Sequence, residues 1–362
     1  MRVLLTADPE LPVPPTLYGG IERIVADLAR ALRDLGHTVG LVAHRESTAP
    51  VDAFYPWPGA RSQVKSDTIR NALALRRAVG AFRPDVVHSF SRLLYLLPIL
   101  RSKLPKIMSY QRAPSLRTTR WANRLAGGTL RFTGCSEYIC RLGRRGGGDW
   151  TAIHNFVDVD RFTFVPSVPP DAPLVFLSRV ESIKGPHLAI AVAKRAGRRL
   201  VIAGNHSATP AEAQYWQTQI EPHLGRDGIE YIGPVDDRQK TELLGQAAAL
   251  LVPIQWDEPF GIVFVEALAC GTPVISCHRG ALPEIVRDAC HGFLMDSVDE
   301  LVKAVSRLHE IDRRACRAQA VEFFSVALVI RRYEELYAAT TGVGQRSDRI
   351  RFPGDFPVRQ VP

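Results

Sequence analysis

Short apolar runs alternate along this chain with longer segments in which apolar residues recur at helical spacing. The run from Val3 to Ala7 predicts a buried strand, and Thr38 to Ala43 predicts another. Between them, apolar residues from Ile21 to Leu35 fall on one face of a helix that Gly36 ends. A strand, a helix and a second strand in this order form the βαβ unit of a parallel sheet.

The same alternation continues through the rest of the chain. Further strands are predicted at 85–90, 106–110, 131–135 and 151–154, and in the second half at 174–177, 200–203, 230–232, 249–253, 273–277 and 292–295. Helical segments separate them, apart from a less regular, arginine-rich stretch at 115–127. This pattern predicts an α/β protein with two doubly wound sheets, whose strand-to-helix loops face each other across a cleft.

A proline-rich segment separates the two predicted sheets. Four prolines interrupt the periodic pattern between Val165 and Pro173, a composition typical of a linker. With 362 residues, the chain also exceeds the roughly 250–300 at which a single hydrophobic core stops growing. We therefore expect an N-terminal domain at 1–165, a C-terminal domain at 166–325, a last helix at 326–339 that returns to the first domain, and a flexible polar tail at 340–362.

Positive charge is concentrated in one region. The formal net charge is +9, and residues 101–150 alone contain eleven Lys or Arg against two acidic residues. A solvated surface is the simplest interpretation. The alternative is that residues 101–145 contact an anionic membrane or an anionic acceptor. No helix-turn-helix, zinc-finger or RNA-recognition pattern favours nucleic acid.

The remaining composition favours a cytoplasmic enzyme, with peripheral contact to the inner face of the membrane as the option that the basic region leaves open. No apolar stretch reaches the roughly 20 residues that a bilayer-spanning helix needs, and the N-terminus has no signal-peptide core. The six cysteines form no C-x-x-C pair and accompany no histidine at zinc spacing. Neither a metal site nor a disulfide framework is therefore predicted.

The strongest motif lies in the second half, where two glutamates stand eight positions apart. Glu258 follows a predicted buried strand and precedes Pro259 and Gly261, whereas Glu266 lies within a helix that Gly271 ends. The first amides of that helix have no intrahelical partners and carry the positive end of its dipole, which suits sugar hydroxyls or phosphate oxygens. In the alternative interpretation, Glu258 only caps the helix and Glu266 is a solvated helical residue.

The stretch from Glu258 to Ile275 resembles the E-x7-E motif of the retaining family 4 glycosyltransferases. Members of this family have the GT-B fold, in which two Rossmann-like domains face each other across a central cleft. The resemblance implies that Glu258 faces the donor sugar and that Glu266 faces the ribose hydroxyls. It also implies that four backbone amides hold sugar hydroxyls and the diphosphate, those of Phe260, Gly261, Ile262 and Val263.

A second motif follows the first predicted strand of the second domain. Arg179 and Lys184 resemble the donor-phosphate site of the same family, with Ser178 where glycine is usual. Arginine clamps a phosphate through two N–H groups and lysine adds a point charge, so the pair neutralises a diphosphate leaving group without a metal ion. The alternative is a pair of surface residues. Gly204, at the end of the next predicted strand, is a further donor-binding candidate.

Two weaker motifs lie in the first half. Gly19 and Gly20 follow the first strand, where glycines let backbone amides approach an anion, although an ordinary turn is the alternative. His88 ends a predicted buried strand and resembles the first histidine of the family's P-D-x-x-H-x-H segment, with Phe90 at the position of the second. The resemblance implies that Gly19 and Gly20 close over the donor phosphates and that His88 meets the donor sugar, whereas a lone strand histidine is more often structural.

A fifth motif, 153–162, resembles the segment in which the family crosses between its domains, with Phe156 in place of a glycine. Five motifs thus occur in the family's order over residues 1–337. They imply transfer of a hexosyl group from a nucleoside diphosphate sugar to an acceptor hydroxyl with retention of configuration. No cofactor or metal ion is expected beside the donor, for which UDP-glucose is the predicted choice. No motif places a carboxylate as a covalent nucleophile, which favours front-face attack assisted by a phosphate oxygen of the leaving group.

The motifs leave the acceptor open. A cell-surface glycan or lipid-linked intermediate of polysaccharide biosynthesis, a small molecule, and a pterin or other natural product are the alternatives. A nucleotide-sugar epimerase on the same fold needs further acid and base residues that the sequence does not locate, and a non-catalytic sugar-nucleotide-binding subunit could lose Lys184 or Glu258, which are present. A nicotinamide dehydrogenase is excluded because no G-x-G-x-x-G opens the first helix of either domain.

Overall fold

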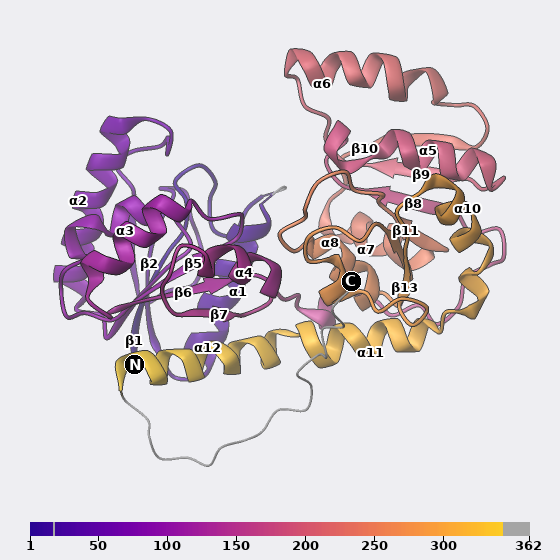
Figure 1. The fold of residues 1–362 in the computed structure, drawn as a ribbon. Coiled ribbons are helices and arrows are strands. Elements are labelled where there is room, and N and C mark those ends of the chain that lie inside the picture. Colours follow the sequence, from indigo (N-terminus) through magenta and orange to yellow (C-terminus); the bar gives the residue numbers. More distant parts are fainter. Residues whose placement is uncertain (17–18, 343–362) are drawn as a thin grey trace.

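The computed structural model of the chain describes residues 1–16 and 19–342 and contains two entirely parallel sheets (Figure 1). The first has seven strands in the order β3-β2-β1-β4-β5-β6-β7, and the second has six in the order β10-β9-β8-β11-β12-β13. In each sheet, successive strands are added first on one side of the first strand and then on the other, so the strand order reverses between β1 and β4 and between β8 and β11. Two Rossmann-like sheets of this kind confirm the predicted fold class.

The first sheet takes every strand up to Ala152. Its strands are β1 (Arg2–Thr6), β2 (Thr38–Ala43), β3 (Ala53–Pro56), β4 (Val86–Ser89), β5 (Lys106–Tyr110), β6 (Leu130–Gly134) and β7 (Trp150–Ala152). The helices between them are α1 (Gly20–Asp34), α2 (Lys65–Phe82), the 3-10 helix η1 (Leu93–Ile99), α3 (Leu116–Ala126) and α4 (Glu137–Arg144). The arginine-rich stretch that lacked a clear pattern therefore forms a regular helix, α3.

The second sheet begins after the proline-rich segment. Its strands are β8 (Leu174–Leu177), β9 (Leu200–Ala203), β10 (Ile229–Gly233), β11 (Ala249–Leu251), β12 (Val274–Ser276) and β13 (Gly292–Leu294). Its helices are α5 (Pro186–Arg195), α6 (Pro210–Tyr215), α7 (Asp237–Gln246), α8 (Ile262–Ala269), α9 (Leu282–Ile285), α10 (Val298–Ser306) and α11 (Arg313–Phe324). Short 3-10 turns occur at Val159–Arg161, Ser182–Lys184, Glu221–His223 and Leu308–Glu310, and a π-helical turn at Trp216–Ile220 extends α6.

Alternating strand residues bury the two faces of the first sheet in different cores. Val3 and Leu5 of β1 pack with α1 and with the last helix, α12 (Val326–Thr341). Leu4, which points to the opposite face, packs with α2, η1 and α3. The second sheet and its helices share one larger core. Each half of the molecule therefore has its own apolar interior.

The last two helices join the halves. In Figure 1, α11 and α12 follow one another in yellow beneath the second and then the first half. The aromatic rings of Tyr333 and Tyr337 on α12 are buried in the core of the first half. α12 extends two residues beyond the predicted helix, so part of the expected tail is helical, and residues 343–362 lie outside the described residues.

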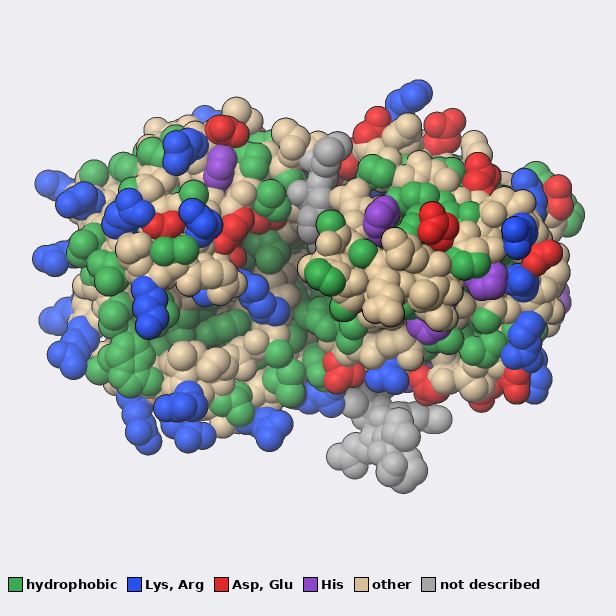
Figure 2. All heavy atoms as spheres, turned by 90° about the horizontal axis from the view of Figure 1, so that it is seen from above, with side chains coloured by type: hydrophobic (Ala, Val, Ile, Leu, Met, Phe, Trp, Pro, Cys, Tyr) green, Lys and Arg blue, Asp and Glu red, His purple; other side chains and the backbone are tan. Residues whose placement is uncertain are grey.

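The surface differs between the halves. In the space-filling view, Lys and Arg side chains surround the first half, whereas both signs of charge mix on the second, and a groove separates the two (Figure 2). Within residues 1–16 and 19–342, no helix is both long enough and apolar enough to cross a bilayer. All six cysteines are free, and five of them are buried.

Candidate functional site

The two loops that follow β8 and β11 bring the predicted phosphate-binding lysine to the first glutamate of the E-x7-E motif. Lys184 Nζ lies 2.5 Å from Glu258 Oε2, and only 11% of each side chain is exposed. The indole Nε1 of Trp256 donates to the same carboxylate oxygen at 2.9 Å. The ammonium of Lys184 also lies 4.8 Å from the centre of the Trp256 ring. The ammonium and carboxylate thus form one compact, nearly enclosed group.

Two glycines allow these loops to approach so closely. Gly185 has φ 74°, and a Cβ atom there would lie 2.1 Å from the carbonyl oxygen of Pro253 in the loop after β11. Gly204, after β9, has φ 133°, and its Cβ would lie 1.9 Å from the carbonyl oxygen of Ser178. Both positions require glycine for conformation and for space. They fix the spacing between the carboxyl ends of β8, β9 and β11.

Arg179 stands at the edge of this group. Its Nη1 lies 2.7 Å from Glu181 Oε1, and 38% of its side chain is exposed. The side chain of Glu181 is 13% exposed. The structure therefore places Arg179 in the same loop as Lys184 but pairs it with a different carboxylate.

The N-terminus of α8 faces the glycine loop of the first half. Gly261, with φ 87°, precedes α8, so the amides of Ile262 and Val263 belong to the first turn, which has no intrahelical acceptors. A Cβ on Gly20, the first residue of α1, would lie 3.0 Å from Ile262 Cδ1, and a Cβ on Gly19 would lie 2.6 Å from Pro15 Cβ. The two predicted anion-binding segments therefore meet across the groove.

The side chain of Phe260 is buried and packs against other aromatic rings. Its ring is 2% exposed and packs 5.9 Å from the ring of His154 and 5.8 Å from that of Phe324, measured between centroids. The preceding Pro259 accepts a hydrogen bond from Ser136 Oγ at 2.6 Å through its carbonyl oxygen. Contacts from the first half thus hold the turn that carries Glu258, and only the backbone of Phe260 remains a candidate for the donor.

A lysine that the sequence did not indicate pairs with the second glutamate of the motif. Glu266, 7% exposed, lies in α8 with its Oε1 2.5 Å from Lys240 Nζ on α7. Lys240 also lies 3.3 Å from Asp237, whose other carboxylate oxygen is 2.5 Å from Arg23 of α1. Burial would raise the pKa of Asp237, but Lys240 and Arg23 together lower it below its usual value. A row of four alternating charges thus connects Glu266 to the first half.

The role expected for His88 is wrong for this structure. The imidazole is fully buried, with Nδ1 2.7 Å from Tyr337 Oη and Nε2 2.6 Å from Ser109 Oγ. Burial lowers its pKa from 6.5 to about 3. Because both ring nitrogens are occupied and α12 covers the ring, His88 is a neutral core residue and does not meet a donor sugar. The strand pattern placed it correctly in β4 but could not show which helix covers that face.

A pocket of about 270 Å³ opens at the carboxyl ends of β4 and β5. Residues 90–94 and 108–113 line it, together with Ile21, Ser115 and Thr118. Gln111 accepts a hydrogen bond from Asn155 at 2.7 Å, and the Oδ1 atom of Asn155 is buried without a partner among the described residues. No sequence motif indicated this pocket, although the ends of parallel strands beside a switch point are the expected place for a ligand.

An aspartate after β1 lies beside this pocket. Burial, assisted by Glu10, raises the pKa of Asp8 to about 6, although Arg112 and Arg92 act in the opposite direction. Asp8 Oδ2 lies 3.3 Å from Arg112 Nη2, and its Oδ1 has no partner among the described residues. The edge of the pocket therefore contains a carboxyl group that titrates near neutral pH.

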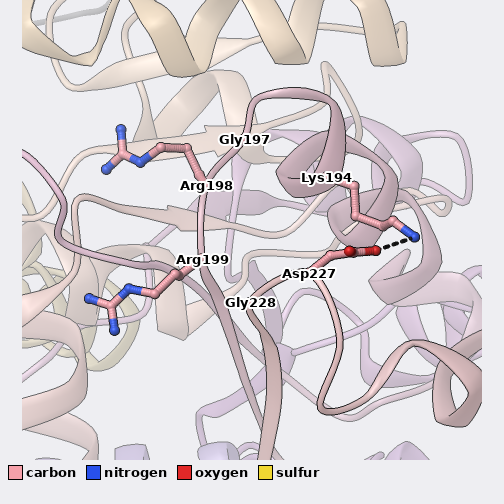
Figure 3. A pocket seen from close by; sticks show the side chains of 6 residues that line it. All are labelled: Lys194, Gly197, Arg198, Arg199, Asp227 and Gly228. Carbon is pink, nitrogen blue, oxygen red and sulfur yellow. Dashed lines mark ion pairs between the residues drawn. The ribbon is translucent and has the colours of Figure 1, made fainter.

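Figure 3 shows the residues that line a second pocket, of about 540 Å³. This pocket is lined by Lys194, Gly197, Arg198, Arg199, Asp227 and Gly228, with Lys194 paired to Asp227 at 2.8 Å. Arg199 and Gly228 directly precede β9 and β10, so this pocket lies at the amino ends of strands. Ligands of open α/β sheets bind at the carboxyl ends, which excludes it as the main site.

In the described part of the chain, no group of three or more His, Cys, Asp or Glu residues is placed to hold a metal ion. The fixed positive charges near the groove come instead from Arg179, Lys184, Lys240 and Arg23, and from the N-terminus of α8. An arrangement of cations around closely packed glycine turns can bind a diphosphate and hold its departing charge.

Comparisons with known families assign both halves. Residues 18–161 match the family described as Glycosyltransferase Family 4, and residues 164–322 match Glycosyl transferases group 1. Among curated proteins, the D-inositol 3-phosphate glycosyltransferase of Mycolicibacterium smegmatis is 34% identical over 158 residues, which cover 41% of this chain and 36% of the relative. The chain thus matches less than half the length of this relative.

Solved structures resemble the whole chain. AviGT4, a glycosyltransferase involved in avilamycin A biosynthesis, is 25% identical with a TM-score of 0.72, covering 95% of this chain and 98% of its own. The Anabaena protein Alr3699/HepE in complex with UDP-glucose is 19% identical with a TM-score of 0.72, covering 94% of this chain and 100% of its own. The second likeness shows the fold alone.

Proposed function

Because this chain belongs to the family 4 glycosyltransferases with the GT-B fold, we propose that it transfers a hexosyl group from a nucleoside diphosphate sugar to an acceptor hydroxyl. The observation that carries the proposal is the group formed by Lys184, Glu258 and Trp256 beside the N-terminus of α8. A cation and a helix N-terminus suit a diphosphate, and a carboxylate suits the hydroxyls of a sugar.

Six of the predicted residues have a role in this proposal. Lys184 and Arg179 neutralise the diphosphate, and the amides of Ile262 and Val263 add hydrogen bonds to it. Glu258 accepts hydrogen bonds from the sugar, and Glu266 accepts them from the ribose. The contact between Lys184 and Glu258 places both residues where they can bind the same donor, Lys184 at the diphosphate and Glu258 at the sugar.

The reaction breaks the bond between the anomeric carbon and the diphosphate and forms a bond from that carbon to the acceptor oxygen. The proton of the acceptor hydroxyl passes to a phosphate oxygen of the leaving group on the same face, which retains the configuration. The enzyme supplies the preorganised positive charge, and no metal ion enters the scheme. UDP-glucose is the proposed donor, which agrees with the ligand of the similarly folded Alr3699/HepE.

The acceptor enters the pocket at the ends of β4 and β5. This pocket lies in the first half and includes Ile21, which is next to the glycine loop that faces the donor helix. A hydroxyl placed there can approach a sugar held by the second half. A lipid-linked or cell-surface glycan intermediate, a phosphorylated small molecule of the kind named for the Mycolicibacterium relative, and a natural product are the acceptor classes in question.

The test is donor binding and turnover in three variants. We would measure the affinity for UDP-, GDP- and ADP-sugars by calorimetry, and the slow release of nucleoside diphosphate without acceptor, for Lys184→Ala, Glu258→Ala and Lys303→Ala. Lys303 is an exposed lysine of α10 in the same half and is the matched control. One donor should bind to the unaltered chain and to the control, with affinity reduced at least about tenfold in the other two variants, which corresponds to about 1.4 kcal/mol.

Failure of every donor to bind the unaltered chain would contradict a transferase function. Equal binding by all three variants would show instead that the donor lies elsewhere, because charge-assisted contacts to a diphosphate contribute about 1.5–3 kcal/mol each.

A further inference from the structure

The segment that contributes most of the residues lining the acceptor pocket has an unusual charge distribution. Residues 86–136 contain nine Lys or Arg and no Asp or Glu. This interval includes η1 and α3, and Leu93 and Leu94 of η1 and Thr118 of α3 line the pocket. Within residues 19–342, no ion pair involves Arg101, Arg117 or Arg124. Arg112 and Arg131 of the interval pair with Asp8 and Asp149, whereas these three arginines are not neutralised by an acidic residue among the described residues.

Large apolar side chains are exposed among these cations. Leu94 and Leu97 of η1 are 45% and 46% exposed, and Trp121 of α3 is 45% exposed. In a 3-10 helix, residues three apart lie in line, so Leu97 lies beside Leu94, which lines the pocket. Trp121 lies three residues after Thr118, another pocket residue, on the same face of α3. The exposed apolar surface is thus continuous with the mouth of the pocket.

We propose that this rim, the exposed side chains of residues 94–103 and 117–124, docks on an anionic membrane surface and presents the pocket to the head group of a lipid acceptor. Leu, Trp and Arg side chains in this arrangement are the composition of an interfacial surface: the apolar groups enter the head-group region and the cations pair with anionic lipids. The assignment of the pocket to the acceptor rests on the proposed function, but the docking of the rim does not.

Arg92 gives the pocket a positive charge that suits an anionic lipid head group. Its side chain lines the pocket, and its Nε atom is buried and has no hydrogen-bond partner among the described residues. Arg112 is the second cation that lines the pocket, and it pairs with Asp8 at the pocket's edge at 3.3 Å, whereas the Nε–H of Arg92 has no such partner. A buried guanidinium donor without an acceptor favours an anionic group such as a lipid phosphate in this position.

The docking is tested with vesicles and without turnover. The unaltered chain should sediment with vesicles of equal parts phosphatidylcholine and phosphatidylglycerol but not with phosphatidylcholine alone. The Trp fluorescence should shift to shorter wavelength on binding, because Trp121 leaves water, and this shift should be lost in Trp121→Phe. Binding should fall about thirtyfold or more in Arg117→Glu/Arg120→Glu, since each basic residue near such a surface contributes roughly a fivefold gain.

A matched variant separates local docking from net charge. Arg199→Glu/Arg226→Glu changes the net charge equally on exposed positions of the second half and should bind vesicles like the unaltered chain. Leu94→Ser/Leu97→Ser should lower vesicle binding without any change in charge. Melting temperatures of all variants would establish that each is folded.

Three results would overturn the inference: equal binding to uncharged vesicles, equal losses in the two double-charge variants, or no loss in either rim variant. Calorimetry with UDP-glucose on the same preparation keeps the two proposals apart. Donor binding without vesicle binding removes the docking alone, whereas vesicle binding without binding of any donor removes the transferase alone.

Discussion

The ion pair between Lys240 and Glu266 indicates that Lys240 positions the Glu266 carboxylate. Both side chains are nearly buried, at 15% and 9% exposure, with 2.5 Å between Nζ and Oε1. Removing one partner of a buried ion pair leaves the other charge uncompensated, at a cost of about 3–5 kcal/mol. We therefore expect Lys240→Met to raise the dissociation constant for UDP-glucose at least about tenfold, with a smaller change in kcat.

The matched control is Lys240→Arg, which keeps the positive charge and should recover most of the donor affinity. A general loss of structure would lower kcat and donor affinity together in both variants. Unaltered donor affinity in Lys240→Met, measured by calorimetry, would mean that Glu266 does not contact the donor.

His88 gives the chain a pH-dependent stability. The folded protein holds its pKa at about 3, whereas the usual value is 6.5, so the unfolded chain takes up a proton that the folded chain refuses. Stability from this group is complete above pH 6.5 and decreases as the pH falls. Between pH 6.5 and 5 the loss amounts to about 1.5 kcal/mol. We expect the melting temperature of His88→Gln to decrease less over this interval than that of the unaltered chain.

Tyr337→Phe is the control for this comparison, because it removes the hydroxyl beside His88 and keeps the imidazole. Its melting temperature should be lower at both pH values, with the same pH dependence as the unaltered chain. The buried His291, whose pKa burial lowers to about 4, remains in all three proteins and contributes equally. An equal pH dependence in His88→Gln would show that His88 is protonated in the folded state.

At the scale of elements, the sequence predicted most strands because parallel strands are buried on both faces and appear as continuous apolar runs. The edge strand β3 was missed because its exposure alternates and no apolar run marks it. α3 was missed as a regular helix because its apolar face is narrow, at Thr119, Ala122 and Ala126, between exposed arginines. The pattern of apolar residues along a segment indicates which of its residues are buried. β3 and α3 are only partly buried, so their patterns are weak.

The last helix shows what local pattern cannot report. The sequence indicated a helix at α12, but not that Tyr333 and Tyr337 fill the core beneath β4 and cover His88. For the same reason the candidate residues at the ends of β8 and β11 could be found from motifs, whereas Lys240 could not. Its importance depends on the packing of α7 against α8.

α12 should therefore be part of the folding unit of the first half. A chain that ends at Ser325 loses the five buried residues that α12 contributes to that core, which are Val329, Ile330, Tyr333, Leu336 and Tyr337. We expect it to lose the calorimetric unfolding transition of the first half, compared with a chain that ends at Gly342. In the longer chain, Tyr337→Ala alone should cost about 3–5 kcal/mol, as truncation of a buried aromatic ring does. Retention of both transitions in the shorter chain would show that the first half folds without α12.

At the scale of the whole molecule, the two halves meet through pairs far apart in the sequence. Glu284 accepts hydrogen bonds at 2.7 Å from the backbone N–H groups of Glu137 and Tyr138 in α4, and His154 lies 2.9 Å from it. Arg23 of α1 pairs with Asp237 of α7 across 214 positions. No motif contains both members of such a pair, so the contacts between the halves follow only from the packed structure.

The Arg23–Asp237 pair connects the first half to the proposed donor site. Arg23 lies just after the glycine loop. Asp237 also contacts Lys240, which in turn pairs with Glu266. Its side chains are 25% and 58% exposed, so its own strength is modest, about 0–1 kcal/mol, and is screened by salt. Arg23→Asp and Asp237→Arg should each raise KM for the donor by up to about fivefold.

The double variant Arg23→Asp/Asp237→Arg distinguishes a coupled pair from two separate effects. If the pair acts across the groove, the reversed charges attract again and KM returns toward that of the unaltered chain, at low salt more than at high salt. The coupling is read from kcat/KM in the four proteins, with melting temperatures to establish that all are folded. Additive losses in the double variant would mean that each residue acts within its own half, and the row of charges from Arg23 to Glu266 would then not link the halves.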